Sequence, residues 1–316
     1  MRKKISVIGS GQIGSTIALL VGQKDLGDVY LFDIVEGLPQ GKALDLNHCM
    51  ALVNSSCRII GENDYKHLEN SDVVIITAGV PRKPNMNRSD LLNINAKIIG
   101  SVAENVKKYC PNAFVICITN PLDAMVYYFK EKTGIPKNKV CGMSGVLDSA
   151  RFKYYLSELL GVKSGDISAT VIGGHGDDMI PLINSVTIGG ISLGSYISEG
   201  RITESQVNDV VQKAAFAGGE IVGLLKTGSA FYAPAASAVQ MAEAYLKDSK
   251  SVLICSAYLD GEYDTRDLFV GVPAIIGKNG IEGIVRVEMT DNEKVLFDRS
   301  KSSIQKLVQD LKDLDL

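Results

Sequence analysis

Three short stretches of the sequence hold residues that could move a proton or bind an anion. The first is G-G-H-G-D at 173–177, in which glycines flank His175. Flanking glycines allow the backbone to turn sharply and leave the imidazole accessible. Histidine titrates near neutrality, as the proton donor and acceptor in a reversible hydride transfer between a hydroxyl and a carbonyl must. The simpler interpretation is an ordinary loop histidine, one of three in the chain.

The second stretch is L-D-S-A-R at 147–151, where Asp148 and Arg151 lie three residues apart. On a helix they would share one face, and a surface ion pair there is worth roughly a few tenths of a kcal/mol. The alternative interpretation separates their roles. Asp148 would orient and charge an imidazole, and Arg151 would bind a carboxylate through two parallel hydrogen bonds, which lysine cannot do.

The third stretch is P-R-K-P-N-M-N-R at 81–88, which places Arg82 and Arg88 on a segment stiffened by two prolines. It follows an apolar run, S-D-V-V-I-I-T-A-G-V, and precedes a segment with helical spacing. Taken alone, this connection is most simply a surface loop with scattered charge.

A glycine-rich turn, G-S-G-Q-I-G at 9–14, suggests a nucleotide site. Gly9 would allow the tight turn, Gly11 would let a pyrophosphate approach the backbone, and Gly14 would let helix and strand pack closely. Asp33 ends the next strand-like run, 19 residues after Gly14. A carboxylate there accepts both ribose hydroxyls of adenosine and repels a 2′-phosphate, which predicts NAD rather than NADP.

The first half of the chain alternates short apolar runs with helical patterns, which predicts a doubly wound α/β fold with a parallel sheet. The runs are continuous, as strands buried on both faces must be. They are K-I-S-V-I-G-S, D-V-Y-L-F-D-I, S-S-C-R-I-I-G, S-D-V-V-I-I-T-A-G, N-A-F-V-I-C-I-T-N and K-V-C-G-M-S-G.

The second half has a different rhythm, which predicts a mixed α+β domain. I-V-R-V-E-M at 284–289 alternates and predicts a half-solvated antiparallel strand, and G-K-N-G at 277–280 predicts a hairpin turn. Capping boxes mark two helix starts, at Thr203 and Thr290. We expect an NAD-binding Rossmann domain at 1–145 and a catalytic domain at 146–316, sharing an extensive interface.

Composition argues against several kinds of partner. The net charge of −3 offers no basic excess for nucleic acid or an anionic membrane. No 18-residue apolar run exists, and the apolar stretch at the start is too short for a secretory signal. The six cysteines are scattered without a C-x-x-C pair, which favours reduced thiols, a cytoplasmic setting and no metal site.

Together and in this order, the motifs resemble those of the lactate/malate dehydrogenase family, and the resemblance covers essentially the whole chain. Six motifs in register are far more specific than any one of them. They are G-S-G-Q-I-G at 9–14, Asp33, P-R-K-P-N-M-N-R at 81–88, I-T-N-P-L-D at 118–123, L-D-S-A-R at 147–151 and G-G-H-G-D at 173–177.

The resemblance implies that His175 is the acid/base group and Asp148 its partner. Arg151 would bind the carboxylate next to the reacting carbon. Arg88 would polarise the substrate carbonyl as its loop closes over the substrate, and Asn120 would hydrogen-bond the same oxygen. The cofactor would be NAD, and no metal would be needed. The positions that match the family's cofactor-binding residues are Gly9, Gly11, Gln12, Ile13, Gly14, Asp33, Asn95, Ile118 and Asn120.

Arg82 bears on the identity of the substrate. The resemblance implies that this position faces the far end of the substrate, where malate enzymes have arginine and lactate enzymes a neutral residue. A sequestered guanidinium opposite the methyl group of pyruvate would cost about 3–5 kcal/mol. The expected substrates are therefore the dicarboxylates (S)-malate and oxaloacetate. The alternatives are L-lactate and pyruvate on the same scaffold, or a non-catalytic NAD-binding protein.

Two further expectations rest on the resemblance. Asn85 stands where glycine is common in this loop, and it tolerates a left-handed backbone better than most residues. A chain of this length without an N-terminal arm resembles the tetrameric branch of the family. We therefore expect a homotetramer, with a dimer as the alternative.

Overall fold

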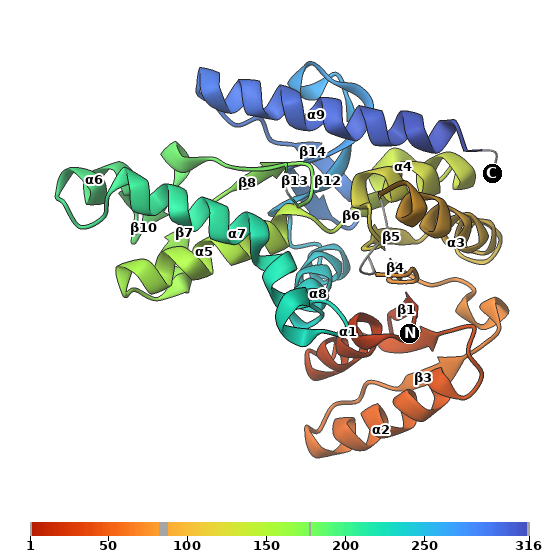
Figure 1. Cartoon of the computed structure of the whole chain (residues 1–316). Helices are drawn as coiled ribbons and strands as arrows, with labels where there is room; N and C mark the ends of the chain where they lie inside the picture. Colours follow the sequence, from red (N-terminus) through yellow and green to blue (C-terminus); the bar gives the residue numbers. More distant parts are fainter. Residues whose placement is uncertain (1, 82–87, 177, 315–316) are drawn as a thin grey trace.

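A computed structural model describes residues 2–81, 88–176 and 178–314 of the chain (Figure 1). Its main sheet begins with parallel strands in the order β3-β2-β1-β4-β5-β6, as the six apolar runs predict. Every side chain of β4 and β5 is buried, because helices cover both faces of the sheet. The strands are β1 (Lys4–Ile8), β2 (Asp28–Phe32), β3 (Ile59–Glu62), β4 (Val73–Ile76), β5 (Phe114–Cys117) and β6 (Val140–Gly142).

The strand order reverses between β1 and β4, and ligands of doubly wound sheets commonly bind at the carboxyl ends of the strands at such a point. The glycine-rich turn follows β1, residues 81–88 follow β4, and I-T-N-P-L-D follows β5. The helices and 3₁₀ turns of this half are α1 (Gln12–Gln23), α2 (Leu38–Leu52), η1 (Tyr65–Leu68), α3 (Arg88–Tyr109), α4 (Leu122–Thr133) and η2 (Lys137–Lys139).

The same sheet continues into the second half of the chain. β12 pairs antiparallel with β6, β13, β8 and β9 follow, and β14 pairs with β13, so these strands and β1 to β6 form one 11-stranded sheet. A small separate sheet joins β7, β10 and β11. The strands are β7 (Ile167–Ser168), β8 (Val171–Gly173), β9 (Met179–Pro181), β10 (Thr187–Ile188), β11 (Ile191–Ser192), β12 (Ser251–Asp260), β13 (Arg266–Gly277) and β14 (Gly280–Ile284).

Helices of the second half cover strands of the first, so the expected extensive interface is present. α8 packs on α1 and β5, and α9 packs on α3 and α4 (Figure 1). The helices and 3₁₀ turns here are α5 (Gly145–Leu160), η3 (Ser164–Asp166), η4 (Ile183–Ser185), α6 (Leu193–Ser198), α7 (Glu204–Leu225), α8 (Tyr232–Leu246), η5 (Glu262–Asp264) and α9 (Asp291–Lys312).

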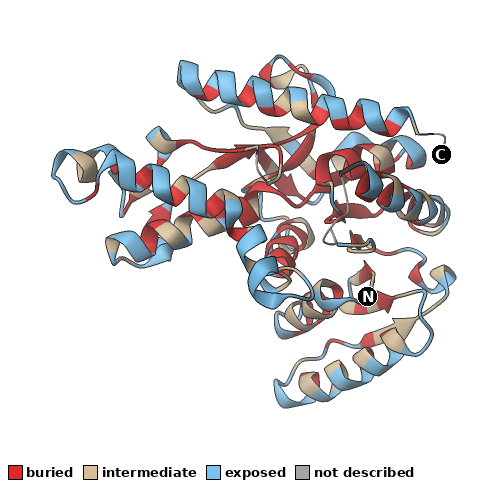
Figure 2. Ribbon diagram, in the orientation of Figure 1, coloured by how far each residue is buried: buried red, intermediate tan, exposed pale blue. Residues whose placement is uncertain are grey.

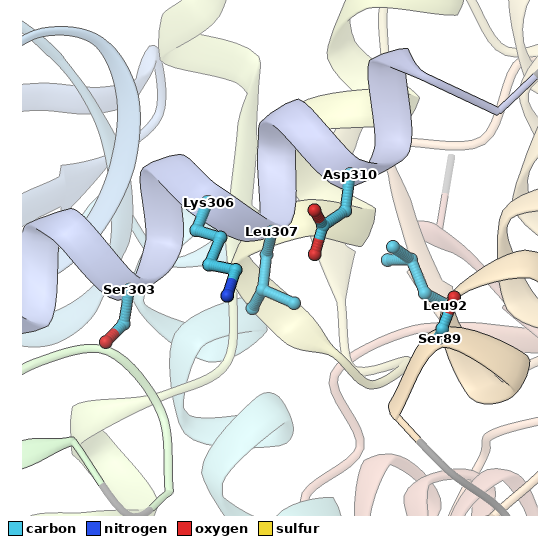
Figure 3. Close-up of a pocket in the computed structure, with 6 residues that line it drawn as sticks. All are labelled: Ser89, Leu92, Ser303, Lys306, Leu307 and Asp310. Atoms are coloured by element: carbon cyan, nitrogen blue, oxygen red, sulfur yellow. The ribbon is translucent and has the colours of Figure 1, made fainter.

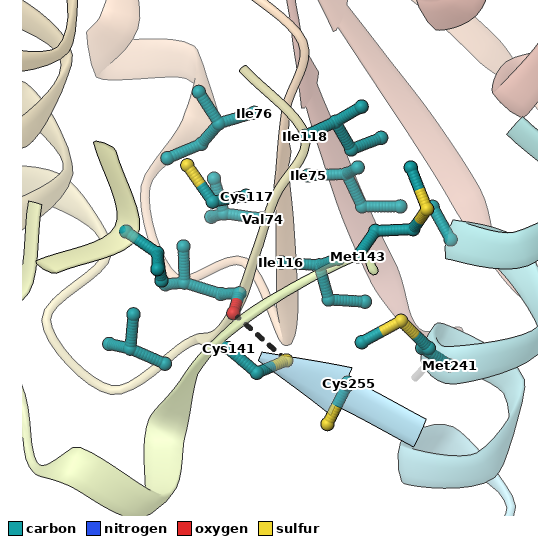
Figure 4. Packing of buried hydrophobic residues seen from close by; sticks show 14 of the residues in the cluster. Val74, Ile75, Ile76, Ile116, Cys117, Ile118, Cys141, Met143, Met241 and Cys255 are labelled. Atoms are coloured by element: carbon teal, nitrogen blue, oxygen red, sulfur yellow. Dashed lines mark hydrogen bonds between the residues drawn. The ribbon is translucent and has the colours of Figure 1, made fainter. Parts of the chain in front are cut away.

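The core lies along the central strands, where buried residues concentrate, while each outer helix has an exposed side (Figure 2). Figure 4 shows isoleucine, valine and sulfur side chains packed where β4, β5, β6 and β12 meet. Cys117, Cys141 and Cys255 lie there with no exposed surface, and all six cysteines of the chain are free, as predicted. Burial raises the pKa of the Cys117 thiol to about 12, so this sulfur is inert.

Several local predictions for the second half are confirmed. Both capping boxes form, with Gln206 returning to Thr203 and Glu293 returning to Thr290. The G-K-N-G segment is the hairpin turn between β13 and β14.

The predicted strand at 284–289 is wrong. β14 ends at Ile284, although burial still alternates, with Val285, Val287 and Met289 half-buried. Instead of a strand ladder, the Tyr263 hydroxyl accepts a hydrogen bond from the Val287 backbone N–H and donates one to the Val285 carbonyl. A side chain thus supplies the partners that a neighbouring strand would have supplied.

Candidate active site

His175 lies in the loop between β8 and β9, between glycines whose backbone conformation other residues rarely adopt. Gly173 and Gly176 on either side have positive φ angles of 89° and 102°. Gly271 of β13 lies so close that an added Cβ would fall 2.4 Å from the Gly173 carbonyl oxygen. The loop is therefore held against the sheet, and the His175 side chain is 13% exposed.

Asp148 is the hydrogen-bond partner of the imidazole. Its Oδ2 lies 2.9 Å from His175 Nδ1, and its side chain is 3% exposed. Asp148 stands in the first turn of α5, where the partial positive charge of the helix N-terminus favours a carboxylate. The structure thus brings together two of the residues that the sequence analysis singled out, although they lie 27 positions apart.

Arg151 follows one turn later on α5 and completes the cluster. Its Nη1 lies 3.7 Å from Asp148 Oδ1, and its side chain is 15% exposed. Beside it, Gly218 of α7 has no Cβ, and one placed there would lie 3.5 Å from Arg151 Nη2. The guanidinium is therefore enclosed between two helices rather than lying on an open surface.

Electrostatics in this cluster favour a protonated imidazole. Burial lowers the pKa of His175, but the charge of Asp148 and its hydrogen bond outweigh burial, so the net pKa is raised. Burial also lowers the pKa of Arg151, against the opposing charge of Asp148. An imidazolium beside an enclosed guanidinium suits an anionic substrate that accepts a proton.

A second group of polar residues supports the His175 loop, and the sequence analysis did not assign it a role. The His175 backbone N–H donates to Asp123 Oδ2 at 3.2 Å, and the Ser256 hydroxyl donates to Asp123 Oδ1 at 2.6 Å. The Gly174 N–H donates to Ser300 Oγ at 2.7 Å. The signal available in the sequence was Asp123 itself, the carboxylate that ends I-T-N-P-L-D shortly after the apolar run.

The glycine-rich turn joins β1 to α1 and has the shape of an anion site. Gly9 has a positive φ of 107°, and a Cβ on Gly14 would lie 1.9 Å from the Gly9 carbonyl oxygen. A Cβ on Gly11, in contrast, would meet nothing within 4 Å. The first turn of α1 has no side-chain cap, and the buried Ser10 hydroxyl has no described partner. These features fit a cofactor pyrophosphate at the helix N-terminus; Gln12 is exposed and Ile13 half-buried there.

Asp33, at the end of β2, is linked to this turn. Its Oδ2 accepts a hydrogen bond from the Ser10 N–H at 2.7 Å, and its Oδ1 accepts one from the Val35 N–H at 3.1 Å. Lys42 of α2, which the sequence analysis missed, donates to the Ser10 carbonyl at 2.7 Å. Burial lowers the pKa of Lys42, partly offset by the charge of Asp33.

Asn95, which matches a cofactor-binding position of the family, has its side chain bonded to the protein backbone. Its side chain is fully buried, with Oδ1 accepting from the Val80 N–H and Nδ2 donating to the carbonyls of Val80 and Asn120. It therefore ties the start of the 81–88 segment to the loop after β5. Asn120 itself is exposed, and Ile118 is buried with its N–H on the Ile76 carbonyl.

The side chains of Arg82, Asn85 and Arg88 lie outside the described residues. Next to that segment, a cavity of about 410 Å³ separates the start of α3 from α9 (Figure 3). It is lined by Ser89, Leu92, Ser303, Lys306, Leu307 and Asp310, and it does not include the His175 cluster. In the described part of the chain no three His, Cys, Asp or Glu residues are grouped to hold a metal, and no helix is long and apolar enough to cross a membrane.

Comparison with known proteins covers the whole chain. The lactate/malate dehydrogenase NAD binding domain matches residues 3–142, and the α/β C-terminal domain of the same family matches 145–314. A malate dehydrogenase of Methylobacterium radiotolerans is 53% identical over 99% of this chain and 98% of its own. The crystal structure of Cryptosporidium parvum malate dehydrogenase is 75% identical with a TM-score of 0.98, over 99% of this chain and all of that chain.

A lactate dehydrogenase has nearly the same fold. The structure of the Cryptosporidium parvum enzyme, complexed with lactic acid and nicotinamide adenine dinucleotide, is 52% identical with a TM-score of 0.97, over 99% of each chain. Fold alone therefore does not separate the two activities. With both halves matched by its domains, the chain belongs to the lactate/malate dehydrogenase family.

Proposed function

We propose that this chain is an NAD-dependent malate dehydrogenase, which interconverts (S)-malate and oxaloacetate. The observation that carries the proposal is the enclosed cluster of His175, Asp148 and Arg151. It places a proton donor and an anion-binding group within one site, as the reduction of a 2-keto acid requires. The identities of 75% and 53% to malate dehydrogenases support the choice of reaction.

In the direction of oxaloacetate reduction, His175 holds a proton on Nε2 while Nδ1 faces Asp148. Asp148 keeps the ring oriented and stabilises its positive charge. Arg151 binds the carboxylate beside the keto carbon, and His175 gives its proton to the keto oxygen. In the reverse direction the neutral imidazole takes the hydroxyl proton of malate.

The residues that would hold NAD are those of the turn after β1, together with Asp33, Asn120 and Ile118. Bound NAD would supply the hydride acceptor and donor. Gly11 leaves the α1 N-terminus open to the pyrophosphate, and Asp33 would accept the adenosine ribose hydroxyls. Asn95 would act on the cofactor indirectly, through the position of Asn120.

Substrate identity depends on two arginines of the 81–88 segment. Arg82 would bind the second carboxylate, and Arg88 would polarise the carbonyl beside Asn120, as the sequence pattern predicts. L-lactate dehydrogenase is the second candidate, because a lactate enzyme at 52% identity has the same fold. A non-catalytic NAD-binding protein is third, and it would have no use for the buried His175–Asp148 pair.

The finer organisation is also proposed. We place the division between an NAD-binding and a catalytic domain at 145/146, immediately after α5 begins. A homotetramer, or alternatively a dimer, is supported by large apolar side chains exposed on α2 and α7, such as Leu52 and Leu224. Six free thiols support a reducing compartment such as the cytoplasm.

Turnover measured with a His175→Asn variant tests the proposal. The wild type should oxidise NADH with oxaloacetate, and the variant should lose turnover by about 100-fold or more while binding NADH as before. Absence of wild-type turnover would contradict the enzyme itself. Equal loss of turnover and NADH affinity in the variant would contradict the role of His175.

A further inference from the structure

Asp123 is a buried carboxylate to which the proposed mechanism gives no role. It stands in the first turn of α4 and is 5% exposed. Both of its oxygens meet donors from other parts of the chain, the Ser256 hydroxyl of β12 at 2.6 Å and the His175 N–H at 3.2 Å. The second donor belongs to the residue that we propose transfers the proton.

Burying an ionised carboxylate costs free energy unless hydrogen bonds or nearby positive charge stabilise it. The net pKa of Asp123 is raised, because burial and the charge of Asp148 outweigh the hydrogen bonds from Ser256 and the His175 N–H that oppose the rise. The N-terminus of α4 adds a partial positive charge that favours the ionised form. Two hydrogen bonds and the helix N-terminus therefore limit the rise in the pKa of Asp123, a carboxyl group that contacts the backbone of the His175 loop.

Among the described residues, the charged groups that act on the pKa of His175 come from two helices. Asp148 and Arg151 lie on α5 and Asp123 on α4, and the two carboxylates raise the pKa of His175 while Arg151 lowers it. The other elements that bind the loop contribute neutral groups: Ser300 of α9 holds the Gly174 N–H and the Asp178 carbonyl, and Ser256 holds Asp123. Asp123 is thus the described group that combines a backbone contact to His175 with a charge.

We propose that Asp123 is a positioning residue for His175, which fixes the backbone of the catalytic loop and, together with Asp148, favours the protonated imidazole. The Ser256 hydroxyl stabilises Asp123 by donating a hydrogen bond to Oδ1, while the His175 N–H donates to Oδ2. The inference rests on the proposed role of His175 as the acid/base group. It adds Asp123, which binds the His175 backbone, to Asp148, which binds the imidazole.

The test is the titration of His175 in the full-length protein, followed by NMR of ¹⁵N-labelled histidine. The chain has three histidines, so His48→Gln and His67→Gln variants assign the signal of His175. Asp123→Asn keeps the shape of the side chain but removes its charge. We expect the midpoint of the His175 titration to move to lower pH, and kcat with oxaloacetate to fall about tenfold at unchanged NADH affinity.

Ser300→Ala is the matched control, because Ser300 binds the neighbouring N–H of the same loop without charge. It should lower kcat but leave the midpoint of His175 in place. An unchanged midpoint in Asp123→Asn, or an equal shift in Ser300→Ala, would overturn the electrostatic role of Asp123.

Ser256→Ala keeps the test decisive if Asp123→Asn does not fold. It leaves Asp123 Oδ1 without a donor, so the carboxyl should protonate more readily and the His175 midpoint should again move to lower pH. No shift there would overturn the proposal. A shifted midpoint in a protein that never turns over oxaloacetate would instead refute the proposed function and leave the pairing of Asp123 with His175 intact.

Discussion

Arg151 lies 3.7 Å from Asp148 across one turn of α5, yet no hydrogen bond among the described residues joins the two side chains. Asp148 commits its Oδ2 to His175 and leaves Oδ1 without a hydrogen bond. The two residues attract each other by charge, but the guanidinium keeps its donors for another anion. The spacing of Asp148 and Arg151 predicts an ordinary helical ion pair, but Asp148 binds His175 and the donors of Arg151 are left for an anion.

Arg151→Lys should damage substrate binding while leaving the cofactor site alone. Lysine keeps the charge but loses the two parallel hydrogen bonds to a carboxylate, so we expect kcat/KM for oxaloacetate to fall by about a hundredfold. Arg201→Lys, at an arginine with a 66% exposed side chain, is the matched control and should have no effect. Steady-state kinetics with oxaloacetate check this, and an Arg151→Lys enzyme of wild-type kcat/KM would remove Arg151 from the substrate site.

Asp148→Asn should move the pH dependence of both directions of the reaction to lower pH, which narrows the pH range of oxaloacetate reduction and widens that of malate oxidation. The pKa of His175 is raised in the folded protein, because the charge and hydrogen bond of Asp148 outweigh burial. Without that charge the pKa falls. Oxaloacetate reduction, which needs the imidazolium, should then lose activity at a lower pH than in the wild type. Malate oxidation, which needs the neutral ring, should persist to lower pH. The check is kcat/KM against pH in both directions, and unmoved limbs would show that Asp148 does not set the titration of His175.

Two glycines of the same turn should respond differently to alanine. Gly11 has a φ of −64° and open space where a Cβ would lie, so Gly11→Ala should leave the free energy of unfolding within about 0.5 kcal/mol of the wild type. It should weaken NADH binding, because the methyl group would occupy the cofactor's approach. Gly14→Ala would press a Cβ against the Gly9 carbonyl and should cost about 2 kcal/mol or more.

Urea unfolding and NADH titration of both variants make the comparison. Wild-type NADH affinity in Gly11→Ala would mean that the pyrophosphate lies elsewhere.

Arg82→Gln should move the substrate preference from oxaloacetate toward pyruvate. Removing the second guanidinium leaves one carboxylate of oxaloacetate unpaired and no longer strands a charge opposite a methyl group. We expect the ratio of the two kcat/KM values to fall by about a hundredfold or more. An unchanged ratio would show that Arg82 does not contact the substrate.

Much of the fold could be predicted because its information is local. Every residue of β4, β5 and β6 is buried, and continuous hydrophobicity is typical of strands that are covered on both faces. The capping boxes at Thr203 and Thr290 are complete within four residues. The predicted strand at 284–289 is wrong because the Tyr263 hydroxyl, rather than a neighbouring strand, binds the backbone of Val285 and Val287, and no local pattern shows so distant a partner.

Some residues of the site could likewise be predicted from the sequence, and others could not. Glycines around His175 and the 147–151 spacing are visible in the sequence, so those candidates could be named from it. Ser256 and Ser300 could not, and Asp123 was visible only as the last residue of I-T-N-P-L-D, because the roles of all three arise when α4, β12 and α9 meet at one loop. Lys42 was missed because a lysine in the middle of a helix resembles any exposed lysine until its contact with the Ser10 carbonyl is seen.

The most direct test of the account is the comparison of oxaloacetate and pyruvate with the wild-type enzyme, by NADH oxidation at 340 nm. We predict that kcat/KM for oxaloacetate exceeds that for pyruvate by about a hundredfold or more, as a sequestered second guanidinium requires. Equal or better use of pyruvate would contradict the account and assign the chain to lactate chemistry.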